Sequence, residues 1–360
     1  MQYPLRSDPV QYFRNCFFSD LAGNALISFQ CNGLREAIRP RPDTALVPQR
    51  PPSVPAVHWL FGQVKKKFCK TLAFRYIAHM PQTPPVVLTI AGFDPSSGAG
   101  ITADIKTIAA HGCYGVAAIT ALTVQSTAGV QKVAPVKPDL LTETLQELVA
   151  DCQVSAVHIG MLGSGEIANR VADFLEKTKL HNVVLDPILV STSGTELLDE
   201  EGIHVLRQRL LPLAAVITPN IPEATSLTGV KISEVDDMRE AASQLHEMGA
   251  RALVITGGHL EKAIDLVSLK ESYTQLFRSD KIDSPNTHGT GCAFSTAIAC
   301  QLAVEHSLST AVLLAKAYVT SAITSGYAIG KGPGPVNHMY RMKNHPRAAG
   351  LAKRLASGKD

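Results

Sequence analysis

Residues 86–110 read VVLTIAGFDPSSGAGITADIKTIAA, and this stretch decides the fold. It opens on an uninterrupted apolar run, Val86–Ala91, followed by a turn rich in glycine and serine. Apolar residues then recur at Ile101, Ile105 and Ile108, a spacing that predicts an amphipathic helix. A strand that is apolar on both faces is typical of a parallel sheet covered by helices on both sides. The segment therefore predicts an α/β protein.

The same alternation continues along the chain. Further strands are expected at 116–124, 156–159, 183–186, 215–218 and 252–256, and further helices at 140–149, 167–177, 205–211, 238–248 and 293–304. Strands that alternate with helices in this way predict a mostly parallel sheet with helices on both faces. In such sheets the ligand binds beyond the carboxyl ends of the strands, so the informative residues should directly follow each strand.

Composition excludes several classes of protein. No apolar run in the 360 residues reaches the roughly 18 to 20 residues that a membrane-spanning helix needs. The seven cysteines are odd in number, scattered and without a C-x-x-C pair, which favours free thiols in a reducing compartment. We therefore expect a cytoplasmic enzyme that acts on a small molecule.

Charge is distributed unevenly. Residues 1–80 carry a net charge of +7, residues 81–340 of −9 and residues 341–360 of +5, and half of the 22 prolines lie within residues 1–85. We expect a basic, Pro-rich, disordered extension over 1–80, one folded domain over 81–340 and a basic tail over 341–360. A transit peptide and a nucleic-acid-binding arm are alternatives for the extension, but it has few serines and no continuous basic face. No nucleic-acid partner is expected.

Polar residues follow the first two strands. Gly92 opens the turn after the first strand, and Asp104 would project from the first turns of the helix that follows. Gln125 lies at the end of the second strand, where its amide offers one acceptor and two donors. Such an amide suits a flat heteroaromatic ring that carries an amino group and ring nitrogens. Ordinary turn residues are the alternative interpretation for each position.

The segment Asn286–Cys292, NTHGTGC, carries the strongest signal. Its small residues leave the backbone amides of 289–292 free to converge at the start of an apolar helix, which favours binding of a phosphoryl group. Cys292 falls at that helix start, where the pKa of a thiol should be lowered and a thiolate could accept a proton from a hydroxyl. A buried structural cysteine is the alternative.

With these segments in view, the chain resembles the hydroxymethylpyrimidine/phosphomethylpyrimidine kinases of thiamine biosynthesis, in the ribokinase-like superfamily. The matching stretches are AGFDPSSGAGITADIKT (91–107), ITALTVQST (119–127), IGML (159–162), VVLDPILVSTSG (183–194), ITPNIPEA (217–224), TGGH (256–259), NTHGTGC (286–292) and AKAYVTSAI (315–323). The resemblance implies a three-layer α/β/α sandwich, a homodimer, and phosphorylation of an aminopyrimidine alcohol and then of its monophosphate, with ATP and Mg²⁺.

The resemblance also implies roles for individual residues. The substrate-binding set is Gly92, Asp104, Gln125 and Met161; the nucleotide-binding set is Asn220, Thr256 and Gly258; the metal-binding set is Asp186 and Glu223; the catalytic set is Gly289, Thr290, Gly291, Cys292 and Lys316. Two positions depart from the family pattern, since many relatives carry Lys where this chain has Thr256 and His158.

Two other functions stay open. A pyridoxal or pyridoxine kinase is the first, because such kinases share this framework and their substrates are also flat rings with a hydroxymethyl group. Gln125 together with Met161 favours the aminopyrimidine. A non-catalytic pyrimidine-binding protein on the same fold is the second, and it would be expected to lack the anion-binding segment or the metal-binding motif.

Overall fold

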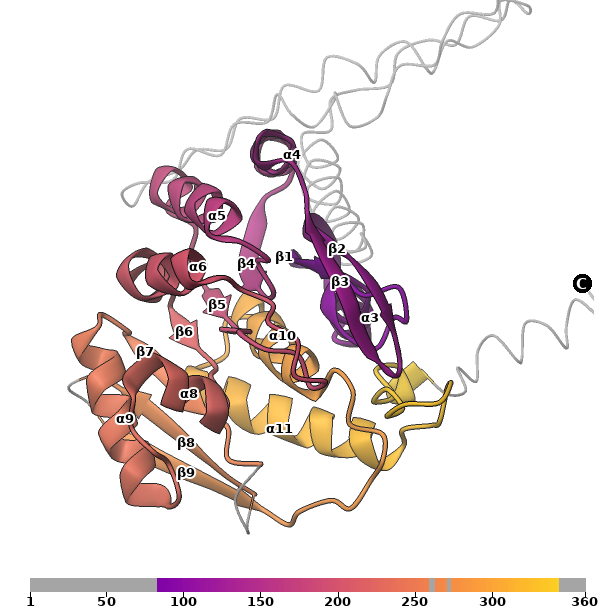
Figure 1. The fold of residues 1–360 in the computed structure, drawn as a ribbon, viewed down its shortest axis with the longest axis vertical. Helices are drawn as coiled ribbons and strands as arrows, with labels where there is room; N and C mark the ends of the chain where they lie inside the picture. The colour runs from indigo at the N-terminus through magenta and orange to yellow at the C-terminus, as the bar shows by residue number, and fades with distance from the viewer. Residues whose placement is uncertain (1–82, 259–262, 271–272, 343–360) are drawn as a thin grey trace, which may run out of the picture. The chain divides into compact units, whose positions relative to one another are not determined.

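The structure is a computed structural model that describes residues 83–258, 263–270 and 273–342 (Figure 1). Within them lies one nine-stranded sheet of order β3-β2-β1-β4-β5-β6-β7-β8-β9. The strands are β1 Val86–Phe93, β2 Tyr114–Ser126, β3 Gly129–Pro135, β4 Val154–Ile159, β5 Val183–Leu185, β6 Val216–Ile217, β7 Ala252–Ile255, β8 Ala263–Leu269 and β9 Thr274–Ser279. From β2 to β7 neighbouring strands pair in parallel, whereas β3, β8 and β9 pair antiparallel. The expected α/β fold with a mostly parallel sheet is confirmed.

Most of the helices connect the parallel strands, and the last two follow β9. The helices are α3 Gly100–Ala110, α4 Pro138–Asp151, α5 Gly165–Thr178, α6 Glu200–Val205, α7 Leu211–Leu213, α8 Ile221–Thr228, α9 Val235–Glu247, α10 Thr290–Ala303 and α11 Leu308–Thr324. A π-helical segment, Leu206–Leu210, joins α6 to α7, and a 3₁₀ turn, Tyr340–Met342, follows α11. The expected helix over 293–304 is present but begins at Thr290, three residues earlier.

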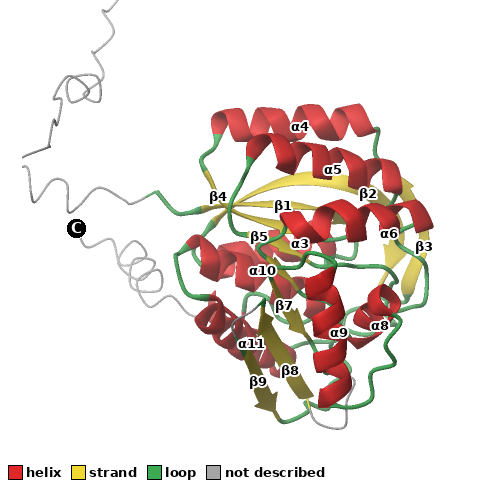
Figure 2. Cartoon of the chain, turned by 90° about the vertical axis from the view of Figure 1, so that its left-hand side faces the viewer, coloured by secondary structure: helices red, strands yellow, loops and turns green. Residues whose placement is uncertain are grey.

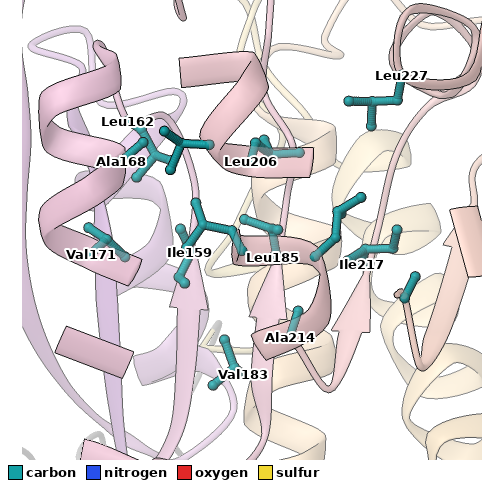
Figure 3. Close-up of a cluster of buried hydrophobic side chains, with 14 of the residues drawn as sticks. Ile159, Leu162, Ala168, Val171, Val183, Leu185, Leu206, Ala214, Ile217 and Leu227 are labelled. Carbon is teal, nitrogen blue, oxygen red and sulfur yellow. The ribbon is translucent and has the colours of Figure 1, made fainter. Parts of the chain in front are cut away.

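Two hydrophobic cores hold the helices against opposite faces of the sheet (Figure 2). Alternate strand residues point to opposite sides, so Leu88 and Ile90 enter one core and Val87 enters the other. The first core packs against α4 to α9, and Figure 3 shows its centre around Ile159 and Leu185. The second core packs against α3, α10 and α11. This is a three-layer α/β/α sandwich, as expected.

The antiparallel strands were not predicted from the sequence. β3 and β9 are edge strands with partly exposed side chains, so neither shows a continuous apolar run. β8 is buried over Asp265–Ser268, but the polar residues at both ends of that stretch break the apolar pattern. All three extend the sheet without altering the parallel part that positions the site.

The predictions for the extension over 1–80 and for most of the tail over 341–360 lie outside the described residues. Within the described residues, no helix is long and apolar enough to cross a membrane.

Candidate active site

The predicted site residues gather along one edge of the sheet. Because the strands from β2 to β7 run parallel, their carboxyl ends meet at this edge. The residues at or directly after these ends are Gly92 on β1, Gln125 on β2, Met161 after β4, Asp186 after β5, Asn220 after β6 and Thr256 after β7. Every strand of the parallel part therefore contributes a predicted site residue.

Two loops from distant parts of the sequence interlock at this edge. They are the loop 94–99 after β1 and the loop 286–289 before α10, which we call the loop pair. Nε2 of His288 lies 2.9 Å from Oδ2 of Asp94. A Cβ on Gly98 would stand 2.1 Å from the His288 ring, and one on Gly289 would stand 1.8 Å from the carbonyl oxygen of Gly98. Only glycine fits at these two positions.

Asp94 organises its own loop as well. Its carboxylate accepts hydrogen bonds from the amides of Ser96, Gly98 and Ala99 and from the Ser96 hydroxyl, at 2.7–3.2 Å. Burial alone would raise the pKa of Asp94, but the bonds from His288, Ser96 and Ala99 outweigh it and lower the pKa. Sequence reasoning missed both Asp94 and His288, although an Asp ahead of a Ser-Ser-Gly turn is a known turn-forming pattern.

The start of α10 offers backbone amides for an anion, as predicted, but not all of those proposed. Gly289 is the N-cap, with φ of +79°. The Thr290 amide donates to the Thr287 carbonyl at 3.2 Å, so it is already engaged. Within the described residues the amides of Gly289, Gly291 and Cys292 donate to no backbone or side-chain acceptor. Three of the four predicted amides are therefore free.

Cys292 differs from the prediction in one respect. Its side chain is buried, and burial together with the nearby carboxylates of Asp104 and Asp186 raises the pKa of the thiol well above its ordinary value. The prediction of a lowered pKa is therefore wrong. A helix N-terminus contributes only about 0.3–1 kcal/mol at an exposed site, which is too little to offset burial near two carboxylates.

The side of the site predicted to bind the substrate is lined by the ends of β1, β2 and β4. A Cβ on Gly92 would stand 2.3 Å from Cε of Met161, so these two predicted residues are in contact. Gln125 is half-buried, and its Oε1 accepts a hydrogen bond from the Thr123 hydroxyl at 3.1 Å. Its amide nitrogen has no hydrogen-bond partner among the described residues, which leaves both N–H groups available to a ligand.

Two further loops hold the hairpin between β2 and β3 that follows Gln125. The Thr195 hydroxyl donates to the Val130 carbonyl at 3.0 Å, and the Ser193 hydroxyl accepts from the Val130 amide at 3.3 Å. From the other side, the Gly332 amide donates to the Thr127 hydroxyl at 3.1 Å. The hairpin tip beside Gln125 is thus braced by segments about 60 and 200 residues away in sequence.

Asp104 does not lie where the sequence suggested. Its side chain is fully buried, and its two oxygens accept hydrogen bonds from Thr89 at 2.7 Å and from Thr296 at 2.9 Å. Nδ1 of His158 lies 3.3 Å from the same carboxylate. The expectation that Asp104 projects from the helix toward a ligand is therefore wrong, because the Asp104 side chain turns into the protein interior and is already bonded there.

The N-x-x-E segment forms the start of α8. Asn220 and Glu223 make a reciprocal capping box, in which each side chain accepts the other's backbone amide at 2.9 Å. Glu223 is buried, and burial together with the charge of Asp186 raises its pKa well above the ordinary value. Burial also raises the pKa of Asp186 to about 6, in spite of hydrogen bonds to Ser295 and Thr218.

These two carboxylates suit a divalent cation. No Lys or Arg forms an ion pair with Asp186 or Glu223 in the part of the chain that the structure describes. Nor does that part contain a cluster of three or more His, Cys, Asp or Glu able to enclose a metal. Mg²⁺ is held by one or two carboxylates plus water and phosphate oxygens, so a pair of carboxylates without a Lys or Arg partner fits its donor preference.

The end of β7 is more open. The Thr256 amide donates to the Pro219 carbonyl at 2.9 Å, which ties this end to the end of β6. Gly258 is exposed, and among the residues that the structure describes no atom lies within 4 Å of the place where its Cβ would stand. Lys316 on α11 forms an ion pair with Asp265 on β8, whose other oxygen accepts the Gly257 amide at 3.1 Å. Lys316 is thus held by Asp265 behind this loop.

The fold and the arrangement of the site define a small-molecule kinase of the ribokinase-like class. Residues 94–337 match the family model described as phosphomethylpyrimidine kinase. The chain belongs to this family.

Two curated relatives illustrate the match. The chain is 42% identical over 257 residues to the hydroxymethylpyrimidine/phosphomethylpyrimidine kinase of Haemophilus influenzae, with 70% of this chain and 96% of the relative covered. It is 44% identical over 255 residues to the thiamine biosynthesis bifunctional protein ThiED of Geobacter sulfurreducens. There the match covers 70% of this chain and 52% of the relative, so the chain spans about half of the bifunctional protein.

Solved structures agree on the fold. The phosphomethylpyrimidine kinase of Clostridium difficile 630 superposes with a TM-score of 0.60 at 38% identity, covering 66% of this chain and 99% of that one. The pyridoxal kinase of Staphylococcus aureus in complex with AMP-PCP and pyridoxal superposes with a TM-score of 0.66 at 32% identity, covering 72% and 96%.

Proposed function

We propose that this protein phosphorylates 4-amino-5-hydroxymethyl-2-methylpyrimidine and then its monophosphate, with ATP as the donor, in thiamine diphosphate biosynthesis. The observation that carries the proposal is the set of free amides at Gly289, Gly291 and Cys292, placed at the sheet edge that also holds Gln125. The kinase names of the relatives and the ATP analogue bound by the Staphylococcus aureus enzyme support it.

In this proposal, residues at different positions of the site bind the pyrimidine ring and stabilise charge on the transferred phosphoryl group. Gln125 would pair with the amino group and ring nitrogen of the pyrimidine, while Gly92 and Met161 contact its face. The hydroxymethyl oxygen would attack the γ-phosphorus of ATP in line, forming a new O–P bond as the bond to the β-phosphate oxygen breaks. Phosphoryl transfer depends mainly on positioning and charge stabilisation, and the free amides of α10 would supply the latter.

A bound Mg²⁺ would neutralise charge on the phosphate oxygens. Asp186 and Glu223 would hold it, and Asn220 keeps Glu223 in place through the capping box. Thr256 and Gly258 would contact the nucleotide, and Lys316 would add positive charge behind it. The proton of the hydroxymethyl group would leave to water, because the Cys292 thiol, whose pKa burial raises, already carries its own proton.

The oligomeric state and the compartment are part of the proposal. We propose a homodimer, and the outward-facing side chains of Leu122 and Val124 on β2, 50% and 60% exposed, support a protein contact there. Light scattering during gel filtration tests this. We propose a cytoplasmic location on the basis of the scattered cysteines, which fractionation of cells tests.

The proposed activity is tested by measuring ADP release with Mg²⁺ and ATP on three acceptors separately: the pyrimidine alcohol, its monophosphate and pyridoxal. We expect turnover of both pyrimidines. Turnover of pyridoxal alone would favour the second candidate function, a pyridoxal kinase. The pyridoxal kinases among the similar structures are the reason for testing this candidate. Binding of the pyrimidine without any turnover would contradict the proposal and favour a non-catalytic role.

A further inference from the structure

His158 on β4 is a buried residue that the proposed mechanism does not use. Its side chain has no exposure and lies between two carboxylates. Nδ1 is 3.3 Å from Oδ2 of Asp104, and Nε2 is 2.8 Å from the hydroxyl of Ser295. That hydroxyl is in turn 3.0 Å from Oδ2 of Asp186. A continuous chain of side chains therefore joins Asp104 to Asp186.

The protons along this chain can be assigned from the acceptors. The Asp104 carboxylate accepts from Thr89, so Nδ1 of His158 must carry a proton to face the same oxygen. A neutral His158 then has a bare Nε2, which would take the only proton of Ser295. The Ser295 hydroxyl would present a lone pair to Asp186, and that contact would become repulsive.

A protonated His158 resolves the conflict. Nε2–H donates to the Ser295 hydroxyl, and the Ser295 proton turns to Asp186 at 3.0 Å. The backbone carbonyls of Gly291 and Cys292, at 3.0 and 3.2 Å from the same hydroxyl, are the competing acceptors. With both carboxylates ionised, only the charged imidazole leaves each of them facing a donor.

We propose that His158 is a positioning residue for the phosphoryl-transfer site: it carries the buried positive charge between Asp104 and Asp186 and, through Ser295, fixes the orientation of Asp186. The inference rests on the proposed function, in which Asp186 holds the metal.

The surroundings of His158 agree with a charged ring. Burial by itself would lower its pKa, but the charges of Asp104 and Asp186 and the bond to Asp104 outweigh it, so the pKa of His158 is raised. The titratable and polar groups that act on it come from several elements: Thr89 on β1, Asp104 on α3, Ser295 on α10 and, through its charge, Asp186 after β5.

The test measures the affinity for Mn²⁺ in the presence of saturating ADP, from the electron paramagnetic resonance signal of free Mn²⁺. His158→Gln keeps polar atoms but removes the charge, whereas His158→Lys restores a charge. We expect Mn²⁺ binding to weaken by about 10-fold or more in His158→Gln, the loss typical of removing a residue that orients a metal ligand. His158→Lys should stay within about threefold of the wild type, and the KM for the pyrimidine should not change in either variant.

His246 provides a matched control. It also bridges a backbone carbonyl at 2.8 Å and a serine hydroxyl at 2.9 Å, but on α9, where no predicted site residue lies. His246→Gln should leave Mn²⁺ affinity unchanged. If folded His158→Gln binds Mn²⁺ like the wild type, or if His158→Lys is as weak as His158→Gln, the proposal is overturned.

Ser295→Ala is a second variant that tests the same proposal if His158→Gln does not fold. It retains His158 and removes only the link to Asp186, so Mn²⁺ binding should again weaken by about 10-fold. Unchanged binding would refute the link. A wild-type protein that binds Mn²⁺ and ADP but does not phosphorylate the pyrimidine would contradict the proposed function and leave the role of His158 standing.

Discussion

The two halves of the candidate site differ in how tightly they are packed. In the loop pair, a Cβ added to Gly98 or Gly289 would lie 2.1 Å or 1.8 Å from a neighbouring atom. At the end of β7, by contrast, no atom of the described residues lies within 4 Å of the position that a Cβ on Gly258 would take. The loop pair is therefore fixed by contacts within the protein, whereas Gly258 makes no such contact with the described residues.

This difference follows from what each half would do. Amides that stabilise charge in a transition state must already be in place, because reorganising them would add to the barrier. The bond between Asp94 and His288, 194 positions apart in sequence, holds both loops without a ligand. A nucleotide is large and must enter and leave, which an open loop permits.

The largest effect is expected from Gly289→Ala, compared with Gly229→Ala. Both glycines have nearly the same backbone conformation, with φ of +79° and +80°, but only Gly289 meets a neighbouring backbone atom. Gly229→Ala should cost about 1 kcal/mol of unfolding free energy, the price of a positive φ alone. Gly289→Ala should cost at least about 3 kcal/mol and abolish turnover, because the loop pair must separate. Urea unfolding followed by circular dichroism measures both.

Equal losses of unfolding free energy in the two variants would mean that the loop pair can move apart at little energetic cost. The comparison between the halves would then lose its basis. Full turnover in Gly289→Ala would in addition contradict the role of the α10 amides.

Much of this arrangement could be predicted from the sequence. Strands such as Val86–Ala91 are apolar apart from Thr89 because both faces of the sheet are covered, and that pattern is visible without a structure. The order of strands along the chain then placed Gln125, Asp186 and Asn220 at one edge. The family resemblance located the same edge independently.

What could not be predicted depends on contacts between distant residues. The bond from His288 to Asp94 has no local signature, and the burial of Asp104 depends on Thr89, His158 and Thr296, which come from three different elements. Edge strands such as β3 lack the continuous apolar pattern because they are partly exposed. In each case tertiary packing, and not local sequence, decides the outcome.

A smaller effect is expected from Lys316→Met in the more open half. Lys316 and Asp265 form a largely buried ion pair, so removing the lysine leaves a carboxylate without its partner and should cost about 3 kcal/mol of unfolding free energy. The double variant Lys316→Met/Asp265→Asn removes both charges and keeps an acceptor for the Gly257 amide, so most of that stability should return. Thermal unfolding and ADP release are measured on all three proteins.

The turnover of the double variant distinguishes two roles for Lys316, assistance to phosphoryl transfer and neutralisation of Asp265. If its charge assists phosphoryl transfer, the double variant should recover stability while turnover stays low. Recovery of both stability and turnover would show that the lysine serves only to neutralise Asp265.

The smallest effect is expected from Cys292→Ser. A base must be unprotonated to accept a proton, and burial near Asp104 and Asp186 keeps the Cys292 thiol protonated at neutral pH by raising its pKa. If the amides of α10 provide the main stabilisation, Cys292→Ser should retain turnover within about 10-fold of the wild type, since it leaves those amides in place.

A thiolate base would instead be revealed by a loss of turnover of about 10²–10⁴-fold in Cys292→Ser. It would also be revealed by a wild-type rate that rises about tenfold per pH unit up to and beyond about pH 8.5, the ordinary pKa of a thiol, because burial raises the pKa of Cys292 above that value. A rate independent of pH over that range, together with an active serine variant, would locate catalysis in the packed backbone of the loop pair and α10 and not in the side chain of Cys292.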